Sequence, residues 1–190
     1  MAQAMRFTSA DLELMPDDGK RREIIDGQLY ASKQPGAEHQ LVCGRATGAL
    51  DRWSLQTGAG EAYGAPGVIF APDDDVAPDV AWYSRERLAS ALDQAGHFHA
   101  APDLVVEVLS PGAHNERRDR ETKLNLYSRR GVREYWIVDW QLRQVELYRR
   151  EQLLQLHLVA TLLEADTLAS PLLPGFALPI HDLFVRAVRP

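Results

Sequence analysis

The feature that most constrains the fold is an apolar run with a single charge inside it. Residues 104–109 read Leu-Val-Val-Glu-Val-Leu, so Glu107 is the one polar residue of the six. Such a run is typical of a central strand buried on both faces of a sheet. A carboxylate is costly there unless it is paired or binds a cation, which leaves a buried salt bridge, a pore at the sheet edge and a cation site open. Strand alternation places Glu107 on one face with Val105 and Leu109.

The segments around this run predict an α/β protein. Residues 133–139 read as a second buried strand, and residues 37–56 and 116–130 carry the patterns of two long helices. Asp26-Gly27 between two short apolar runs is a strong hairpin signal. We therefore expect a mixed β-sheet flanked by helices.

The length and composition of the chain limit how it can be organised. Its 190 residues fit one domain, so we expect a single domain over residues 1–190. The lone cysteine, Cys43, excludes an internal disulfide and a cysteine-cluster zinc site. The N-terminus lacks the apolar core of a signal peptide, and no stretch approaches the ~18 apolar residues of a membrane span. We therefore expect a cytoplasmic protein that does not contact membranes.

The charge is unevenly distributed along the chain. The formal net charge is −6, which disfavours simple electrostatic binding of nucleic acid. Residues 115–150, however, hold 10 of the 21 Lys and Arg and only 6 of the 27 Asp and Glu. A basic strip beside acidic residues suits a metal-dependent enzyme that acts on a phosphate polymer, and it equally suits an ordinary solvated helix.

A second acidic residue also lies in an apolar context. Asp79 follows Pro78 within residues 76–83, which we expect to form one strand. If this strand lies beside the Glu107 strand, two carboxylates face one way and offer the oxygen ligands that magnesium or manganese prefers. The alternative is that Asp79 caps a turn after the proline.

Lysine is rare in this chain, with 3 lysines against 18 arginines. An ammonium can lose its proton when it is buried, which a guanidinium cannot. Lys123, on the predicted helix after the Glu107 strand, is therefore a candidate catalytic group, and an exposed helical lysine is the alternative. Glu23, just before the hairpin turn, could be a further metal-shell carboxylate or could pair with a neighbouring arginine at the surface.

Together these residues resemble the Uma-two family of restriction-endonuclease-like proteins, within the PD-(D/E)xK nuclease superfamily. The specific stretches are Glu-Val-Leu-Ser-Pro at 107–111 and Gly-Val-Arg-Glu-Tyr-Trp at 131–136, with a weak match at Pro78-Asp79. The resemblance extends over nearly the whole chain, to the Leu-Pro-Gly-Phe close at 173–176. It implies a restriction-endonuclease-like core and a nuclease activity.

The resemblance also implies roles for single residues. Asp79 and Glu107 match the metal-binding acids of the superfamily, and the carbonyl of Val108 matches its third protein ligand. The superfamily lysine is missing, because Leu109 stands at its place. In the Uma-two family a lysine from the following helix substitutes for it, at the position of Lys123. Two further matches are an early glutamate, Glu23, and a histidine at the start of the long helix, His39.

The expected function is therefore metal-dependent hydrolysis of phosphodiester bonds in nucleic acid. DNA is the expected substrate, magnesium or manganese the expected cofactor, and a homodimer a candidate assembly. Arg117, Arg118 and Arg120 are candidates for contacts with the phosphate backbone. The same fold could instead serve as a catalytically silent nucleic-acid-binding or assembly module. A serine hydrolase would need Ser110 in contact with a histidine, and Ser110 lacks a nucleophile-elbow sequence.

Overall fold

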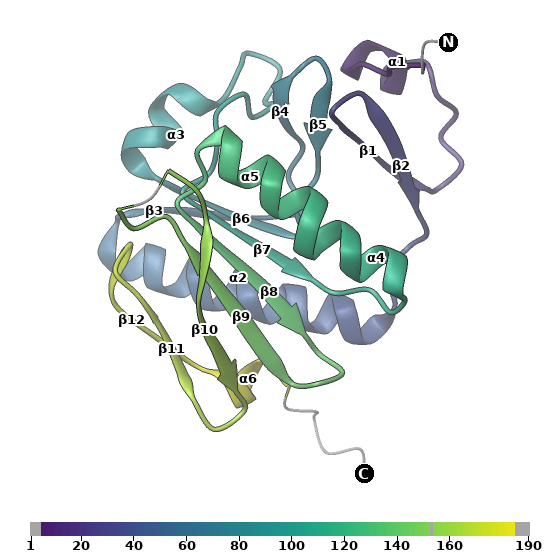
Figure 1. Ribbon diagram of the computed structural model, residues 1–190. Helices are drawn as coiled ribbons and strands as arrows, with labels where there is room; N and C mark the ends of the chain where they lie inside the picture. The colour runs from purple at the N-terminus through teal and green to yellow at the C-terminus, as the bar shows by residue number, and fades with distance from the viewer. Residues whose placement is uncertain (1–4, 153, 185–190) are drawn as a thin grey trace.

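The computed structural model describes residues 5–152 and 154–184, and its main feature is a six-stranded mixed sheet between helices (Figure 1). The strands lie in the order β10-β9-β8-β7-β6-β3. The two central strands, β7 (Leu104–Val108) and β8 (Glu134–Asp139), pair in parallel, and every residue in them is buried. The expected α/β class, with a mixed sheet flanked by helices, is confirmed.

The other strands of this sheet pair in antiparallel fashion. They are β3 (Gly60–Gly64), β6 (Val80–Ser84), β9 (Gln144–Arg149) and β10 (His157–Leu163). A separate hairpin of β11 (Thr167–Ser170) and β12 (Leu173–Pro179) follows, then the short helix α6 (Ile180–Phe184).

Alternation along β7 divides the apolar core into two clusters. Val106 and Val108 pack on the face covered by the long helix α2 (Ala37–Thr57). Val105 and Leu109 pack on the opposite face, in the cluster that includes Leu126 of α5 (Leu124–Arg130). Glu107 shares the second face, as the strand pattern predicts.

The helical segment between β7 and β8 differs from the expected single α-helix over 116–130. It begins earlier, with α4 (Ala113–Arg117), and continues through η1 (Arg118–Lys123), a π-helical stretch, into α5. A π-helix pairs residues five apart, and such stretches are frequent at functional sites. Over the part of the chain that the structure describes, none of the helices is long and apolar enough to cross a membrane.

A smaller sheet lies beside the main one, with strand order β2-β1-β5-β4 (Figure 1). Its hairpin joins β1 (Arg21–Ile25) to β2 (Gln28–Ser32) through Asp26 and Gly27, which have φ of 54° and 73°. Two successive positive φ values are what a type I′ turn requires, so the hairpin prediction is confirmed. The preceding short helix is α1 (Ser9–Glu13).

The expected strand over residues 76–83 is wrong, because the chain changes sheet within it. β4 (Val68–Ala71) and β5 (Asp74–Val76) belong to the small sheet, whereas β6 starts only at Val80 and leads into α3 (Arg85–Ala91). Pro78 has no N–H to donate to a ladder, which explains the break. Asp79 therefore lies directly before β6 and not inside a strand.

A buried carboxylate ties the small sheet to the helical segment. Asp74 is 1% exposed, and its oxygens accept hydrogen bonds from the Asp26 N–H at 2.8 Å and from the Arg129 guanidinium at 2.8 Å. Arg130 also pairs with this carboxylate. Burial alone would raise the pKa of Asp74, but these hydrogen bonds and charges lower it. This contact holds β1, which carries Glu23, against the helix that carries Lys123.

We expect Asp74→Asn to lower the free energy of unfolding by about 1–3 kcal/mol at neutral pH, because it weakens charge-assisted hydrogen bonds. A lowered pKa in the folded state means that the stabilisation is present above the unfolded pKa and is lost as pH falls. The difference in the free energy of unfolding between the wild type and Asp74→Asn should therefore be smaller at acidic pH. Urea unfolding at neutral and acidic pH measures both effects.

The matched control is Asp73→Asn, since Asp73 is exposed and pairs with the exposed Arg6. This change should alter stability by less than about 0.5 kcal/mol. Equal losses in the two variants would show that Asp74 does not tie the sheet to the helix.

Candidate functional site

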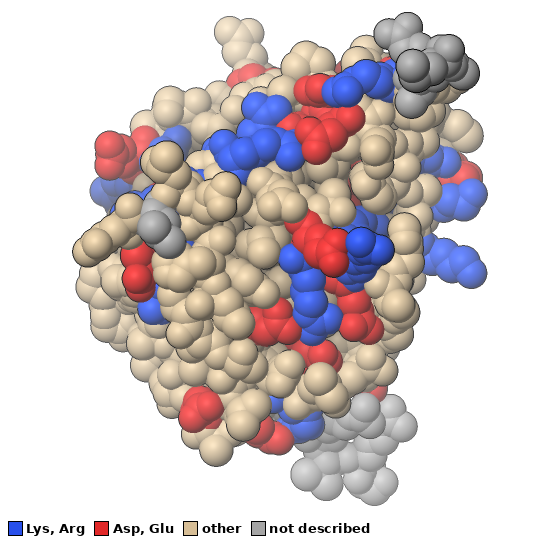
Figure 2. All heavy atoms as spheres, viewed as in Figure 1, with Lys and Arg blue, Asp and Glu red and all other residues tan. Residues whose placement is uncertain are grey.

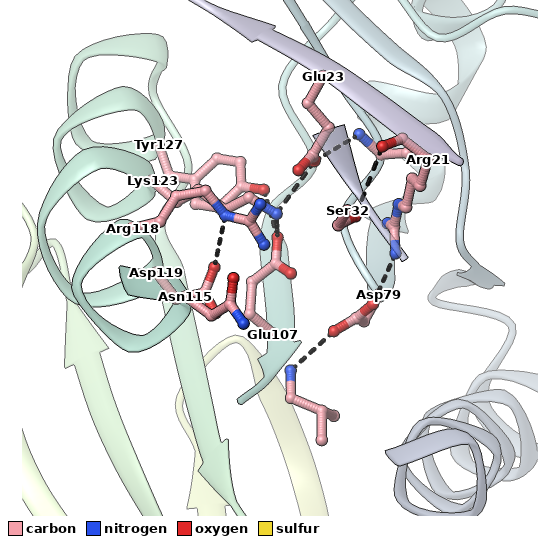
Figure 3. Close-up of polar contacts among 12 residues, drawn as sticks. Arg21, Glu23, Ser32, Asp79, Glu107, Asn115, Arg118, Asp119, Lys123 and Tyr127 are labelled. Carbon is pink, nitrogen blue, oxygen red and sulfur yellow. Dashed lines mark hydrogen bonds and ion pairs between the residues drawn. The ribbon is translucent and has the colours of Figure 1, made fainter. Parts of the chain in front are cut away.

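The expected catalytic and metal-binding residues line one cavity of about 380 Å³, where the small sheet, the end of β7 and the helical segment meet (Figure 3). Three acids and the lysine proposed from the sequence are all among its walls: Glu23, Asp79, Glu107 and Lys123. Val108 and His39 line it as well. The structure thus brings together side chains that are up to 100 positions apart in the sequence.

Glu107 lies at the centre of this group and is 2% exposed. One oxygen, Oε1, accepts hydrogen bonds from the Lys123 ammonium at 2.9 Å and from the Tyr127 hydroxyl at 2.6 Å. Burial raises the pKa of Glu107, Lys123 opposes that rise, and the negative charge of Asp79 adds to it, so that the pKa is about 7. Glu107 therefore forms a buried salt bridge, one of the arrangements that its sequence context left open, and it lies at the wall of a cavity.

Lys123 is also buried and bridges two strands. Its Nζ lies 2.9 Å from Glu107 and 3.0 Å from Glu23, and the same Glu23 oxygen accepts a hydrogen bond from the Ala77 N–H at 3.0 Å. Burial lowers the pKa of Lys123, but the carboxylates of Glu107 and Glu23 outweigh it and raise that pKa above its usual value. The lysine is thus a fixed ammonium and not an exposed helical side chain. Glu23 pairs in the interior and not at the surface.

Asp79 is held by groups different from those that hold Glu107. Its Oδ1 accepts a hydrogen bond from Arg21 at 2.9 Å, and its Oδ2 accepts one from the Val108 N–H at 2.9 Å. His39 Nε2 lies 3.2 Å from Oδ2. Burial would raise the pKa of Asp79, but the His39 hydrogen bond and the nearby positive charges lower it well below its usual range. Asp79 is therefore ionised at neutral pH.

His39 also contacts Cys43, four residues further along α2. Its Nδ1 lies 3.3 Å from the thiol sulfur, and the ligand atoms of His39, Cys43 and Asp79 all lie within 4.8 Å of one another. A histidine, a thiolate and a carboxylate can bind zinc. Burial, with the charge of Asp79, raises the pKa of the Cys43 thiol. A protonated thiol is a poor metal ligand, so the carboxylates suit a cation better than this trio does.

The π-helical stretch adds residues that the sequence analysis missed. Asp119 and Lys123 are its two buried members, and both line the cavity. Arg21 and Tyr127 were missed as well, although both have a sequence signal. Arg21 is two residues before Glu23 on a strand, and Tyr127 is four after Lys123 on a helix, so each shares a face with a predicted residue.

The three arginines proposed for backbone contacts lie in different places. Arg118 lines the cavity, whereas Arg117 pairs with Glu121 at 2.8 Å on the exposed surface. Arg120 pairs with Glu146 at 2.8 Å and Glu116 at 3.0 Å. Figure 2 shows basic and acidic side chains interleaved on this face of the molecule. The excess of positive charge in residues 115–150 therefore does not form a continuous basic surface there.

The donor set fits a hard divalent cation. Four carboxylates, Glu23, Asp79, Glu107 and Asp119, line one cavity and are at least nine-tenths buried, and carboxylate oxygens are the ligands that magnesium and manganese prefer. A serine hydrolase has less support, because Ser110 lines this cavity without a hydrogen bond to any histidine within the described ranges.

The chain matches one described family over most of its length. Residues 9–181 match Uma2, the Uma-two family, whose description is "Putative restriction endonuclease". No curated protein matches the sequence.

The fold is similar to that of a solved structure, described as a "putative nuclease belonging to DUF820" from Anabaena variabilis ATCC 29413. The TM-score is 0.76 at 19% sequence identity, over 94% of this chain and 97% of that chain. At this level of identity the likeness concerns the fold. Because the family match runs from α1 into α6, the protein belongs to the Uma2 family of restriction-endonuclease-like proteins.

Proposed function

We propose that this protein is a metal-dependent nuclease that hydrolyses phosphodiester bonds in nucleic acid, with DNA as the substrate. The observation that carries the proposal is the cavity itself, where two buried carboxylates, Asp79 and Glu107, share a wall with the buried ammonium of Lys123. Buried acids with oppositely shifted pKa values, in a cavity, are characteristic of functional sites. The family assignment points to the same chemistry.

Asp79 and Glu107, with the backbone carbonyl of Val108, would hold magnesium or manganese. When bound, such an ion supplies Lewis acidity to a phosphate oxygen and lowers the pKa of a water. Lys123 supplies a fixed positive charge for the oxygens of the scissile phosphate, and its raised pKa favours this role over proton transfer. Glu23 orients that ammonium from the opposite side. His39 and Arg21 keep Asp79 ionised and in place.

Contacts with the polymer would come from the helical segment. Arg118 lies at the cavity wall and would contact a phosphate next to the scissile one. Arg117 is exposed and can rotate toward substrate at little cost, since its pair with Glu121 is fully exposed as well. Arg120 is held by two acids and is the weakest of the three candidates.

A second candidate function is a catalytically silent nucleic-acid-binding or assembly module. Two observations favour it. Arg21 and His39 already pair with Asp79, as Lys123 does with Glu107, so side chains of the protein occupy part of the place that a cation would take. In addition, Leu109 replaces the lysine that the PD-(D/E)xK pattern has on the strand itself.

Manganese or magnesium should stabilise the fold, because a bound cation compensates the repulsion between buried carboxylates. When the concentration of the free cation is ~100 times its dissociation constant, the free energy of unfolding should rise by about 2.7 kcal/mol. The rise should be larger at about pH 8 than at about pH 6, because a proton on Glu107, whose pKa is about 7, competes with the cation. Thermal melts with and without millimolar manganese, at both pH values, measure this stabilisation.

The control for this experiment is Glu107→Gln, which has no proton to lose at that position and should respond less to manganese at both pH values. If millimolar manganese and magnesium leave the melting temperature of the wild type unchanged, the cation site is refuted.

The protein should nick plasmid DNA in the presence of manganese or magnesium, and chelation should abolish the activity. Asp79→Asn and Glu107→Gln should each remove it, because each takes a ligand from the ion. Lys123→Met should slow cleavage by roughly 100- to 1,000-fold while manganese binding persists, because the lost group stabilises transition-state charge. Nicking rates of purified variants, with folding checked by melting, test this.

The matched control is Lys20→Met, since Lys20 is an exposed lysine that pairs only with Asp18. It should cleave like the wild type. If the wild type cleaves neither duplex DNA, single strands nor RNA with either metal, the silent module replaces the nuclease. If Asp79→Asn cleaves at the wild-type rate, the activity arises elsewhere.

A further inference from the structure

Asp119 is a buried acid to which the proposed mechanism gives no role. It is 3% exposed, lines the cavity, and lies in the π-helical stretch four residues before Lys123. Its backbone carbonyl accepts a hydrogen bond from the buried Tyr135 hydroxyl at 3.1 Å, which fixes this turn against β8. Figure 3 shows its side chain projecting from the helical segment on the side that faces Glu107. A buried, anchored carboxylate at a cavity wall requires an explanation.

The Oδ1 atom of Asp119 has no hydrogen-bond partner. The nearest positive group is the Nε of Arg118 at 3.6 Å, too long for a hydrogen bond, and this Nε has no acceptor either. Within the described ranges four buried side-chain N or O atoms lack a partner, and three of them belong to Arg21, Arg118 and Asp119, which line this one cavity. Unused hydrogen-bonding capacity is therefore concentrated where a ligand would bind.

The charge around Asp119 specifies the kind of ligand. Glu23, Asp79, Glu107 and Asp119 are all at least nine-tenths buried, and Lys123 is the one lysine or arginine at the cavity that is equally buried. Arg21 and Arg118 are less buried, with 26% and 11% of their side chains exposed. An excess of buried negative charge is costly unless a cation compensates it. The group that completes this cavity is therefore positively charged.

We propose that Asp119 is a positioning residue of the cation site, and that its carboxylate, whose Oδ1 makes no hydrogen bond, accepts one from a water bound to magnesium or manganese. This inference rests on the proposed function, since it adds a third acid to the site of Asp79 and Glu107. Such ions take one or two carboxylates and keep several waters, which need acceptors. Asp119 supplies an acceptor from the same helical stretch that places Lys123, so one element orients both the water and the ammonium.

The test is the affinity for manganese alone, measured by electron paramagnetic resonance of the free ion. Asp119→Asn preserves the size of the side chain but removes its charge and one acceptor. It should weaken manganese binding by ~10- to 100-fold, the loss typical of groups that hold a metal's ligands in place. Asp119→Glu retains the charge but moves the oxygen, so its manganese affinity should lie between those of Asp119→Asn and the wild type. If Asp119→Asn does not fold, Asp119→Glu carries the test, and wild-type affinity in that variant overturns the inference.

The matched control is Glu121→Gln, which makes the same charge change two residues away on the exposed side of the helix. It should bind manganese like the wild type. Arg118→Gln separates cation binding from simple pairing with Arg118. If Asp119 serves the cation, this change leaves or strengthens manganese affinity. If Asp119 only pairs with Arg118, Arg118→Gln and Asp119→Asn weaken it equally, and the inference is overturned.

The failure of this inference and the failure of the proposed function look different. A wild type that binds no manganese overturns the proposed cation site as a whole. A wild type that binds manganese, with Asp119→Asn binding equally well, overturns the role of Asp119 and leaves Asp79 and Glu107 as the ligands.

Discussion

The buried ammonium of Lys123, between Glu107 and Glu23, is the interaction on which the rest of the structure depends. It joins three elements that are distant in sequence: β7, β1 and the π-helical stretch. Burying these charges is costly, and only their close mutual contact offsets the cost. The small sheet therefore cannot move away from the main sheet without exposing an unpaired charge. The contact of Asp74 with Arg129 and Arg130 fixes the far end of the same interface, so β1 is held at two points.

The position of the site follows from the two faces of one strand. Val106 and Val108 give β7 an apolar face against α2, whereas Glu107 lies on the other face, between Val105 and Leu109. The same alternation that completes one core thus places a carboxylate at the base of a cavity in the other layer. Because β7 and β8 are buried along their whole length, the carboxylate stands on the least mobile part of the fold. Chemistry that needs fixed geometry benefits from such a support.

The sequence predicts those parts of the molecule that local pattern determines. Four features each specify an element with little help from the rest of the chain: the apolar run at 104–109, the strand pattern at 133–139, the face of the long helix and the Asp26-Gly27 turn. Pro78 gives a local signal for a break in the strand, but the change of sheet at this point depends on how the two sheets dock, which local pattern does not reveal. The π-helical stretch has no sequence signature. The contact of Arg21 with Asp79 spans 58 positions and depends on how the two sheets dock. The roles of Asp79, Glu107 and Lys123 remain predictions, although the residues do line one cavity.

Two carboxylates in one cavity have different partners, and this difference decides how each responds to charge. Asp79 accepts hydrogen bonds from a backbone N–H and a guanidinium, with an imidazole beside it, so its pKa is low and it is ionised with or without a cation. Glu107 has one ammonium and one hydroxyl on the same oxygen, and burial keeps its pKa about 7. Its charge therefore changes with its surroundings near neutral pH, whereas that of Asp79 does not. A cation entering between them would change the protonation of Glu107 alone, because Asp79 has no proton to lose.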